Sequence, residues 1–132
     1  MENTIEMEIN SCPFCKLDSD REPILESEKA FAIFDKFPVN DGHALIIPKR
    51  HCADYFDLSP EEQTDCMLLV NQVQKIIKRQ FNPDGFNIGI NIGDRAGQTV
   101  HHVHIHLIPR YHGDVEDPMG GVRGVVPGKQ KY

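Results

Sequence analysis

Three histidines alternate with apolar residues in the C-terminal third of the chain. They are His102, His104 and His106, within the run HHVHIHLIPR. Strand alternation would place the three imidazoles on one face and the intervening apolar residues on the core-facing side. Because imidazole titrates near neutral pH and is a good nucleophile when neutral, this row predicts a chemical role.

The spacing of the row limits what it can do. Alternate strand residues lie about 6.6 Å apart, so the outer two rings are separated by roughly 13 Å. Metal–nitrogen bonds of about 2.0–2.1 Å cannot bring all three rings to one ion, although two neighbours could chelate. A linear array instead suits phosphoryl or nucleotidyl transfer, in which one ring attacks an α-phosphorus and its neighbours contact the oxygens and the leaving group. A row of structural or solvated histidines is the simpler alternative.

The elements that must position this row follow from the apolar pattern and the turn residues. Four strands are expected, at residues 30–34, 43–47, 86–91 and 99–109. The first two are joined by an Asp-Gly turn and form a hairpin. A long helix is expected after Ser59, which caps it together with Glu62, and Asn82 begins the segment that stops it. Antiparallel strands around one long helix indicate an α+β domain.

Composition describes an ordinary globular domain. The chain has 132 residues, 39% of them hydrophobic, which predicts a single domain. Residues 1–11 are expected to be loosely held, 12–112 to form the core, and 113–132 to form a Gly- and Pro-rich extension. The net charge of −6 argues against nucleic-acid binding, and no apolar run is long enough for a membrane span. With four cysteines and no secretory signal, we expect a cytoplasmic protein with reduced thiols.

The histidine row and its surroundings resemble the histidine triad (HIT) family. Residues 102–108 match the family signature His-φ-His-φ-His-φ-φ, in which φ is apolar. The resemblance covers residues 12–112 and includes Phe34-Asp35, residues 42–51, Asn91 and residues 96–100. The Gly-Gln-Thr-Val lead-in and the Leu-Ile-Pro-Arg exit are more similar to the fragile-histidine-triad branch of dinucleoside polyphosphate hydrolases than to the phosphoramidase-type branch.

This resemblance implies a fold and a set of catalytic residues. The fold is HIT-like, with an antiparallel sheet of about five strands, one long helix and a short helix, assembled as a homodimer. His104 is the nucleophile that becomes nucleotidylated, and His106 contacts the α-phosphate and the leaving oxygen. His102 supports the array, and His43 belongs to the same network.

The resemblance also implies nucleotide-binding residues. Asp35 binds the ribose hydroxyls, with Phe34 beside it, and Asn91, Gln98 and Thr99 contact phosphate or the bridging oxygen. Positions 35 and 91 carry Asp and Asn here, where the fragile branch tends to carry Asn and Gln. The resemblance therefore implies the chemistry and leaves the substrate open.

A second group of residues with metal or redox chemistry is the motif Cys12-Pro13-Phe14-Cys15. Three interpretations are open: a glutaredoxin-like redox pair, two buried reduced thiols, or half of a structural zinc site. A zinc site needs two further ligands, for which His51 and His102 are candidates, and some histidine-triad relatives bind zinc with a similar set. Cys52 is a spare ligand, and Cys66 is expected to pack in the core.

The sequence thus predicts a nucleotide hydrolase or nucleotidyl transferase that acts on dinucleoside polyphosphates, with no organic cofactor and with Mg²⁺ accompanying the polyphosphate. The alternatives are a purine nucleoside phosphoramidase, a nucleotide-binding regulatory module with little turnover, and a metal-dependent hydrolase built on His-x-His. We hypothesise that the C-terminal tail, with Arg123 within Gly-Gly-Val-Arg-Gly, closes over the site, either of the same chain or of a partner subunit. The remaining charged residues of interest are assigned to the surface: Lys49, Arg50, Arg110, Asp114, Glu116 and Asp117.

Overall fold

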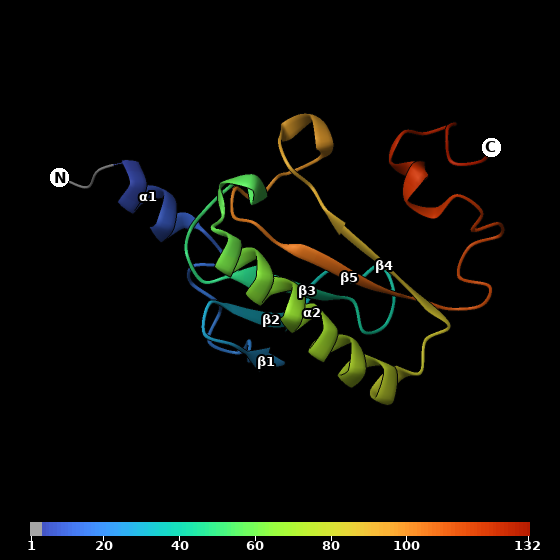
Figure 1. Cartoon of the computed structure of the whole chain (residues 1–132), viewed down its shortest axis with the longest axis horizontal. Helices are drawn as coiled ribbons and strands as arrows, with labels where there is room; N and C mark the ends of the chain where they lie inside the picture. Colours follow the sequence, from blue (N-terminus) through green and yellow to red (C-terminus); the bar gives the residue numbers. More distant parts are fainter. Residues whose placement is uncertain (1–3) are drawn as a thin grey trace.

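The computed structural model describes residues 4–132, which form a five-stranded antiparallel sheet with a long helix across one face (Figure 1). The order of the strands in the sheet is β1-β2-β3-β5-β4. The strands are β1 Leu25–Glu26, β2 Ala30–Phe34, β3 Ala44–Pro48, β4 Gly85–Ile90 and β5 Ile105–Arg110, and the helices are α1 Thr4–Ser11 and α2 Pro60–Phe81. This confirms the predicted α+β architecture.

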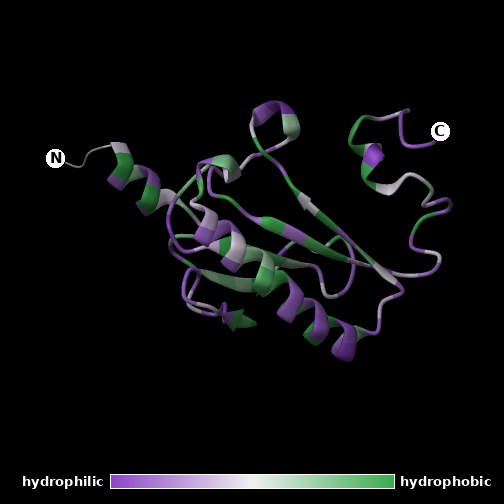
Figure 2. Ribbon diagram, in the orientation of Figure 1, coloured by the Kyte–Doolittle hydropathy of each residue, from purple (hydrophilic) through white to green (hydrophobic). Residues whose placement is uncertain are grey.

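Helix α2 begins and ends where the sequence predicts. The Ser59 hydroxyl accepts a hydrogen bond from the Glu62 N–H, and the Glu62 carboxylate accepts one from the Ser59 N–H. Asn82 ends the helix in the left-handed conformation, with φ 50°. Figure 2 shows hydrophilic residues along the outward surface of α2. Its apolar stripe is buried against the sheet and consists of Cys66, Leu69, Val70, Val73 and Ile77.

The two faces of the sheet differ because side chains alternate along each strand. The residues that face α2 are apolar and fully buried: Ala30, Ala32, Ala44, Ile46, Ile105 and Leu107. On the opposite face the N-terminal segment, with Cys12 and Phe14, covers a second apolar cluster of Ile33, Leu45 and Ile47. His106 pairs with Leu45 in register, so it also lies on this second face.

The strand that carries the histidine row is shorter than predicted. The sequence predicted a strand over 99–109, but β5 begins at Ile105, and the preceding eight residues have turn or irregular backbone. Gly97 turns the chain with φ 94°, and the Val103 N–H donates to the Cys52 carbonyl at 2.7 Å instead of to a strand neighbour. His102 and His104 therefore precede the strand, and only His106 lies in it.

The ends of the chain contain elements that the sequence did not place. Residues expected to be loosely held form α1, in which no described residue is buried, and residues 1–3 lie outside the described residues. The short strand β1 pairs with β2, with Leu25 opposite Ala32. After β5 the chain continues as irregular backbone with a 3-10 helix over Gly121–Val125. This C-terminal tail and α1 lie at opposite ends of the sheet (Figure 1).

Between residues 4 and 132, each helix is too short or too polar to cross a membrane.

Candidate active site and metal cluster

One nitrogen of the His104 ring is hydrogen-bonded to the backbone. Its Nδ1 lies 2.9 Å from the carbonyl oxygen of His102, and because a carbonyl only accepts, Nδ1 carries the proton. In the neutral ring the lone pair is then on Nε2. The side chain is only partly buried, so this nitrogen can act as a nucleophile. If Nε2 forms a bond, the positive charge on the ring faces the same carbonyl oxygen, which stabilises it.

His106 is oriented by a second imidazole. The Val39 N–H donates to Nδ1 of His43 at 3.1 Å, so the proton of His43 is on Nε2, which lies 3.0 Å from Nδ1 of His106. His106 therefore accepts at Nδ1 and carries its own proton on Nε2. The ring centroids of His104 and His106 are 5.1 Å apart. A hydrogen-bond donor on His106 thus lies beside the ring of His104 that has its lone pair on Nε2.

Asp35 completes this network at the end of β2. One carboxylate oxygen lies 3.5 Å from Nε2 of His43, and the other accepts from the Phe37 N–H at 2.9 Å. Asp35, His43 and His106 offer ligand atoms within 4.8 Å of one another. Because these atoms bond to one another and to the backbone, the arrangement indicates a hydrogen-bonded network rather than an open set of metal ligands.

Burial keeps the imidazoles of this network uncharged at neutral pH. Burial lowers the pKa of His43, despite the nearby Asp35 carboxylate. Burial, followed by the charges of His104 and His43, lowers the pKa of His106 to about 4. His106 is therefore a neutral hydrogen-bond donor.

We expect this lowered pKa to make the protein less stable on mild acidification. Between pH 6.5 and about 4, His106 is protonated in the unfolded chain but not in the folded one, so the unfolding free energy falls with pH, by roughly 3 kcal/mol. Urea unfolding at neutral pH and at about pH 4.5 measures this loss in the wild type and in His106→Asn. The variant keeps every histidine except His106, so the wild type should lose more unfolding free energy on acidification than the variant does. Equal losses would contradict this expectation.

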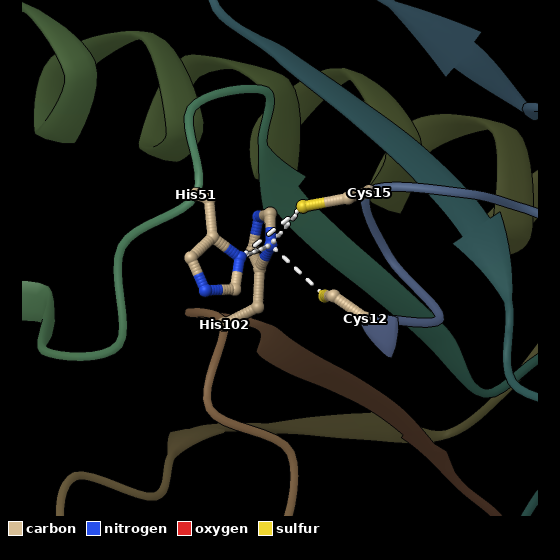
Figure 3. A group of neighbouring side chains, drawn as sticks. All are labelled: Cys12, Cys15, His51 and His102. Atoms are coloured by element: carbon tan, nitrogen blue, oxygen red, sulfur yellow. Dashed lines mark hydrogen bonds between the residues drawn. The ribbon is translucent and has the colours of Figure 1, made fainter. Parts of the chain in front are cut away.

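The four predicted metal ligands converge on one point (Figure 3). Cys12 and Cys15 follow α1, His51 follows β3 and His102 precedes β5. Nδ1 of His102 lies 3.4 Å from both sulfurs and 3.3 Å from Nδ1 of His51, and that nitrogen is 3.2 Å from the Cys15 sulfur. All four ligand atoms lie within 4.8 Å of one another. Two thiols and two imidazoles in this arrangement could hold a metal ion.

The surroundings of the cluster suit metal binding. The Nε2–H of His102 donates to the Pro48 carbonyl at 2.7 Å, and burial lowers the pKa of this ring, so the lone pair is on Nδ1 and faces the cluster. Burial, together with Cys12, raises the pKa of the Cys15 thiol to about 11. A bound cation would favour the thiolate and offset this burial. The residues present therefore fit a divalent metal.

The other cysteines and the redox interpretation are also tested by the fold. A glutaredoxin-like pair stands between a strand and a helix, whereas this pair follows α1 and residues 13–15 of the motif form a turn. Cys52 donates to the Asp54 carbonyl and lies outside the four-residue cluster. Cys66 lies on the face of α2 that packs against the sheet and is fully buried, which confirms its predicted place in the core.

A cleft of about 1280 Å³ opens beside His106. One wall is the sheet, with His43, His106, Asn87 and Asn91, and the other is the C-terminal tail, with Val122, Val125 and Gln130. Arg110 and Asp114 also line the cleft and form a bidentate ion pair at 2.7 and 2.8 Å. Asp114, which was assigned to a solvated surface run, is therefore a structural residue. The ion pair holds the start of the tail against the sheet.

The predicted nucleotide-binding residues fall into two groups. Asp35 and Asn91 lie at the site, because Asp35 adjoins His43 and Asn91 lines the same cleft as His106. Thr99 is exposed on the loop that precedes the histidines.

Gln98 and Phe34 are placed differently. The buried Gln98 side chain accepts from the Gly93 N–H and donates to the carbonyls of Ala53 and Val100, so it shapes the loop and has no free donor for a phosphate. Phe34 lies on the α2 face of the sheet, with its ring 6.0 Å from that of Phe81, away from the histidines. Because successive side chains of a strand point to opposite faces, a residue one position before or after Phe34 would point toward the face that holds the histidines.

Two residues have surroundings that the sequence did not reveal. The buried Phe14 ring lies 5.0 Å from the His104 ring, a contact between residues 90 positions apart that no local pattern signals. Arg123 is exposed and stacks 4.8 Å above the Tyr132 ring. The tail around it does border the site, because Val122 and Val125 line the cleft beside His106, whereas Arg123 itself is not among the lining residues.

Comparison with known proteins places these features in a family. The model of the HIT domain matches residues 16–113. Bis(5'-adenosyl)-triphosphatase of Dictyostelium discoideum is 42% identical over 96 residues, which cover 73% of this chain and 64% of the relative. A crystal structure of a HIT family protein from Bacillus anthracis has a TM-score of 0.74 at 42% identity and covers 80% of this chain and 77% of that one.

A Zn-bound histidine triad family protein from Mycobacterium smegmatis has a TM-score of 0.74 at 35% identity, covering 83% of this chain and 81% of that one. The domain match includes the strands, α2 and all three histidines of the row, as the sequence resemblance implied. This chain therefore belongs to the HIT family.

Proposed function

We propose that this protein is a nucleotide hydrolase or nucleotidyl transferase that cleaves dinucleoside polyphosphates at the α-phosphate through a covalent nucleotidyl-His104 intermediate. The observation that carries the proposal is the pair of fixed tautomers, which leaves a lone pair on Nε2 of His104 and a proton on Nε2 of the adjacent His106. The similarity to a protein named bis(5'-adenosyl)-triphosphatase supports a polyphosphate substrate.

The proposed reaction has two steps. Nε2 of His104 attacks the α-phosphorus and the bond to the bridging oxygen breaks. The remaining nucleoside polyphosphate leaves as an anion that accepts a hydrogen bond from Nε2–H of His106, and the imidazolium of His104 faces the His102 carbonyl. Water then attacks the phosphorus, the P–N electron pair returns to Nε2, and a proton is released to solvent with the nucleoside monophosphate.

The remaining site residues take the roles that the family resemblance implies. Asp35 binds the ribose hydroxyls, and its position beside His43 brings the sugar to the histidine row. Asn91 contacts the phosphates from the wall of the cleft, and Thr99 does so from the exposed loop. Gln98 positions that loop rather than contacting substrate.

The charged residues that line the cleft affect which leaving group the site can accommodate. Among its described residues, Arg110 is paired with Asp114 and Lys131 with Asp117, while Glu116 adds a further negative charge. A polyphosphate therefore needs Mg²⁺ to offset its own charge. The same negative balance suits an amine leaving group, which makes a purine nucleoside phosphoramidase the second candidate.

A comparison of two substrates tests this proposal. For diadenosine triphosphate we expect kcat/KM to rise at least about tenfold when Mg²⁺ is added, and for adenosine 5'-phosphoramidate to stay unchanged. AMP release measured by chromatography gives both values. Faster turnover of the phosphoramidate than of the Mg²⁺-loaded polyphosphate would favour the second candidate, and AMP binding without turnover of either would favour a regulatory module.

We further propose that the metal of the cluster is zinc and that the protein is a homodimer. Zinc prefers a tetrahedral set of thiolates and imidazoles, and when bound it supplies a structural cross-link. For the homodimer, the support is that β4 is an edge strand of the sheet with Ile88 half-exposed, and that α2 exposes Met67 and Leu68. Light scattering of the purified chain measures the assembly. The cytoplasmic location stays a prediction of the sequence.

A further inference from the structure

The backbone that carries His104 is not held by the sheet. Residues 102–104 precede β5, and the Val103 N–H donates to Cys52 in the segment after β3, at 2.7 Å. His104 is instead oriented through its own ring, by the 2.9 Å bond from Nδ1 to the His102 carbonyl. The direction in which the nucleophilic nitrogen points therefore depends on where His102 lies.

His102 is in turn held by the metal cluster. Nε2 of its ring is bonded to the Pro48 carbonyl at 2.7 Å, and Nδ1 lies 3.4 Å from both cysteine sulfurs. One residue thus contacts the metal ligands with its side chain and the nucleophile with its carbonyl. A movement of its ring away from the sulfurs would shift the acceptor that fixes the His104 ring.

Phe14 makes a second link between the same two sites. It lies between the two cysteines and is buried, with its ring 5.0 Å from the His104 ring and 6.0 Å from the His102 ring. Because Cys12 and Cys15 both face His102, the position of the Phe14 ring is set by the loop that the metal would close. The Cys12–Cys15 loop is therefore linked to the nucleophile in two ways: directly, through the Phe14 ring, and indirectly, through the hydrogen bond from His104 to the His102 carbonyl.

We propose that the Cys12–Cys15 loop is a clamp on the nucleophile: a divalent metal held by the cluster fixes His102 and Phe14, and Phe14 is a positioning residue for His104. The expected effect of the clamp on the reaction rate rests on the proposed function, whereas its effect on the orientation of the His104 ring does not. In-line attack needs the reacting atoms at about 3–3.5 Å, and a displacement of about 1 Å can lower the rate about a hundredfold.

Nitrogen NMR of histidine rings tests the clamp without relying on turnover. Protein labelled with ¹⁵N-histidine is compared when loaded with Zn²⁺ and after chelation. We expect the Nδ1–H signal of His104 to shift or broaden on chelation, while the ring signals of the exposed His112 stay unchanged. Unchanged His104 signals would overturn the proposal.

A pair of matched variants separates the ring of Phe14 from general packing. Phe14→Leu should keep one bound Zn²⁺ per chain, shift the His104 signals, and lower kcat about 10- to 100-fold with KM within about twofold. Phe31→Leu, in the same apolar cluster but without a ring contact to a histidine, should leave kcat and the His104 signals unchanged. A raised KM at constant kcat would overturn the assignment and make Phe14 a substrate contact. If chelation shifts the His104 signals of the wild type but the wild type forms no nucleotidyl adduct, the clamp is supported and the proposed function is refuted.

Discussion

Replacement of His104 by Ala is expected to abolish the covalent nucleotidyl adduct and to lower kcat by about 10⁴-fold. No other ring in the site has its lone pair free at the same place, since Nδ1 of His106 accepts from His43 and Nδ1 of His102 faces the cysteines. Intact-mass measurement after brief mixing with diadenosine triphosphate and Mg²⁺ detects the adduct, which should have the mass of one AMP group in the wild type alone.

The chain provides a matched control for this experiment. His101 adjoins the row but is exposed, so His101→Ala should form the adduct at the wild-type rate. His104→Asn, which keeps a side chain of similar polarity, guards against a loss of folding in the alanine variant. An adduct of the same mass in His104→Ala would contradict the proposed nucleophile. Turnover without any adduct in the wild type would indicate direct attack by water.

Removal of the metal is expected to have the second largest effect. If free Zn²⁺ is present at about a thousand times its Kd, its loss lowers the unfolding free energy by about 4 kcal/mol. For a chain of this size that corresponds to a fall in Tm of about 15 °C. The reason is that the ligands join the N-terminal segment to His51 and His102, which come from two other parts of the chain. Thermal unfolding of zinc-loaded and chelator-treated protein measures the difference.

Two cysteine variants show whether the cluster is responsible. Cys15→Ser should have the low Tm of the chelated protein and should no longer respond to added Zn²⁺. Cys52→Ala removes a buried thiol that lies outside the cluster, so it should keep the full response to chelation with only a small loss of its own, about 1 kcal/mol. A chelator effect that persists in Cys15→Ser would place the metal elsewhere.

Features set by neighbouring residues were predictable from the sequence. The capping box at Ser59 and the apolar stripe of α2 gave the helix, since both depend on spacings within a few residues. Short apolar runs on either side of the Asp-Gly turn gave β2 and β3, and the alternation of residues 102–106 together with the family resemblance gave the histidine row. The Cys-x-x-Cys motif predicted half of a metal site as one of three interpretations, and the family resemblance supported His51 and His102 as the other ligands.

Features set by distant residues were not predictable in this way. Alternation over 99–109 looks the same whether or not the backbone pairs with a strand, so the start of β5 depended on the bond between Val103 and Cys52. Likewise, Phe34 and Gln98 have residue types that suit nucleotide binding. The packing of Phe81 and the free carbonyls of Ala53 and Val100 decided their actual positions.

By itself, the sequence determined α2, the strands β2, β3 and β4, the family, and the residue types available for chemistry. Only the tertiary structure decided which nitrogen is protonated in His43, His102, His104 and His106, because that depends on which carbonyl, N–H or neighbouring ring meets each imidazole. The same holds for the contact between the cysteine loop and His104. A side chain can act as a nucleophile, a donor or a metal ligand, and its neighbours in space select one of these roles.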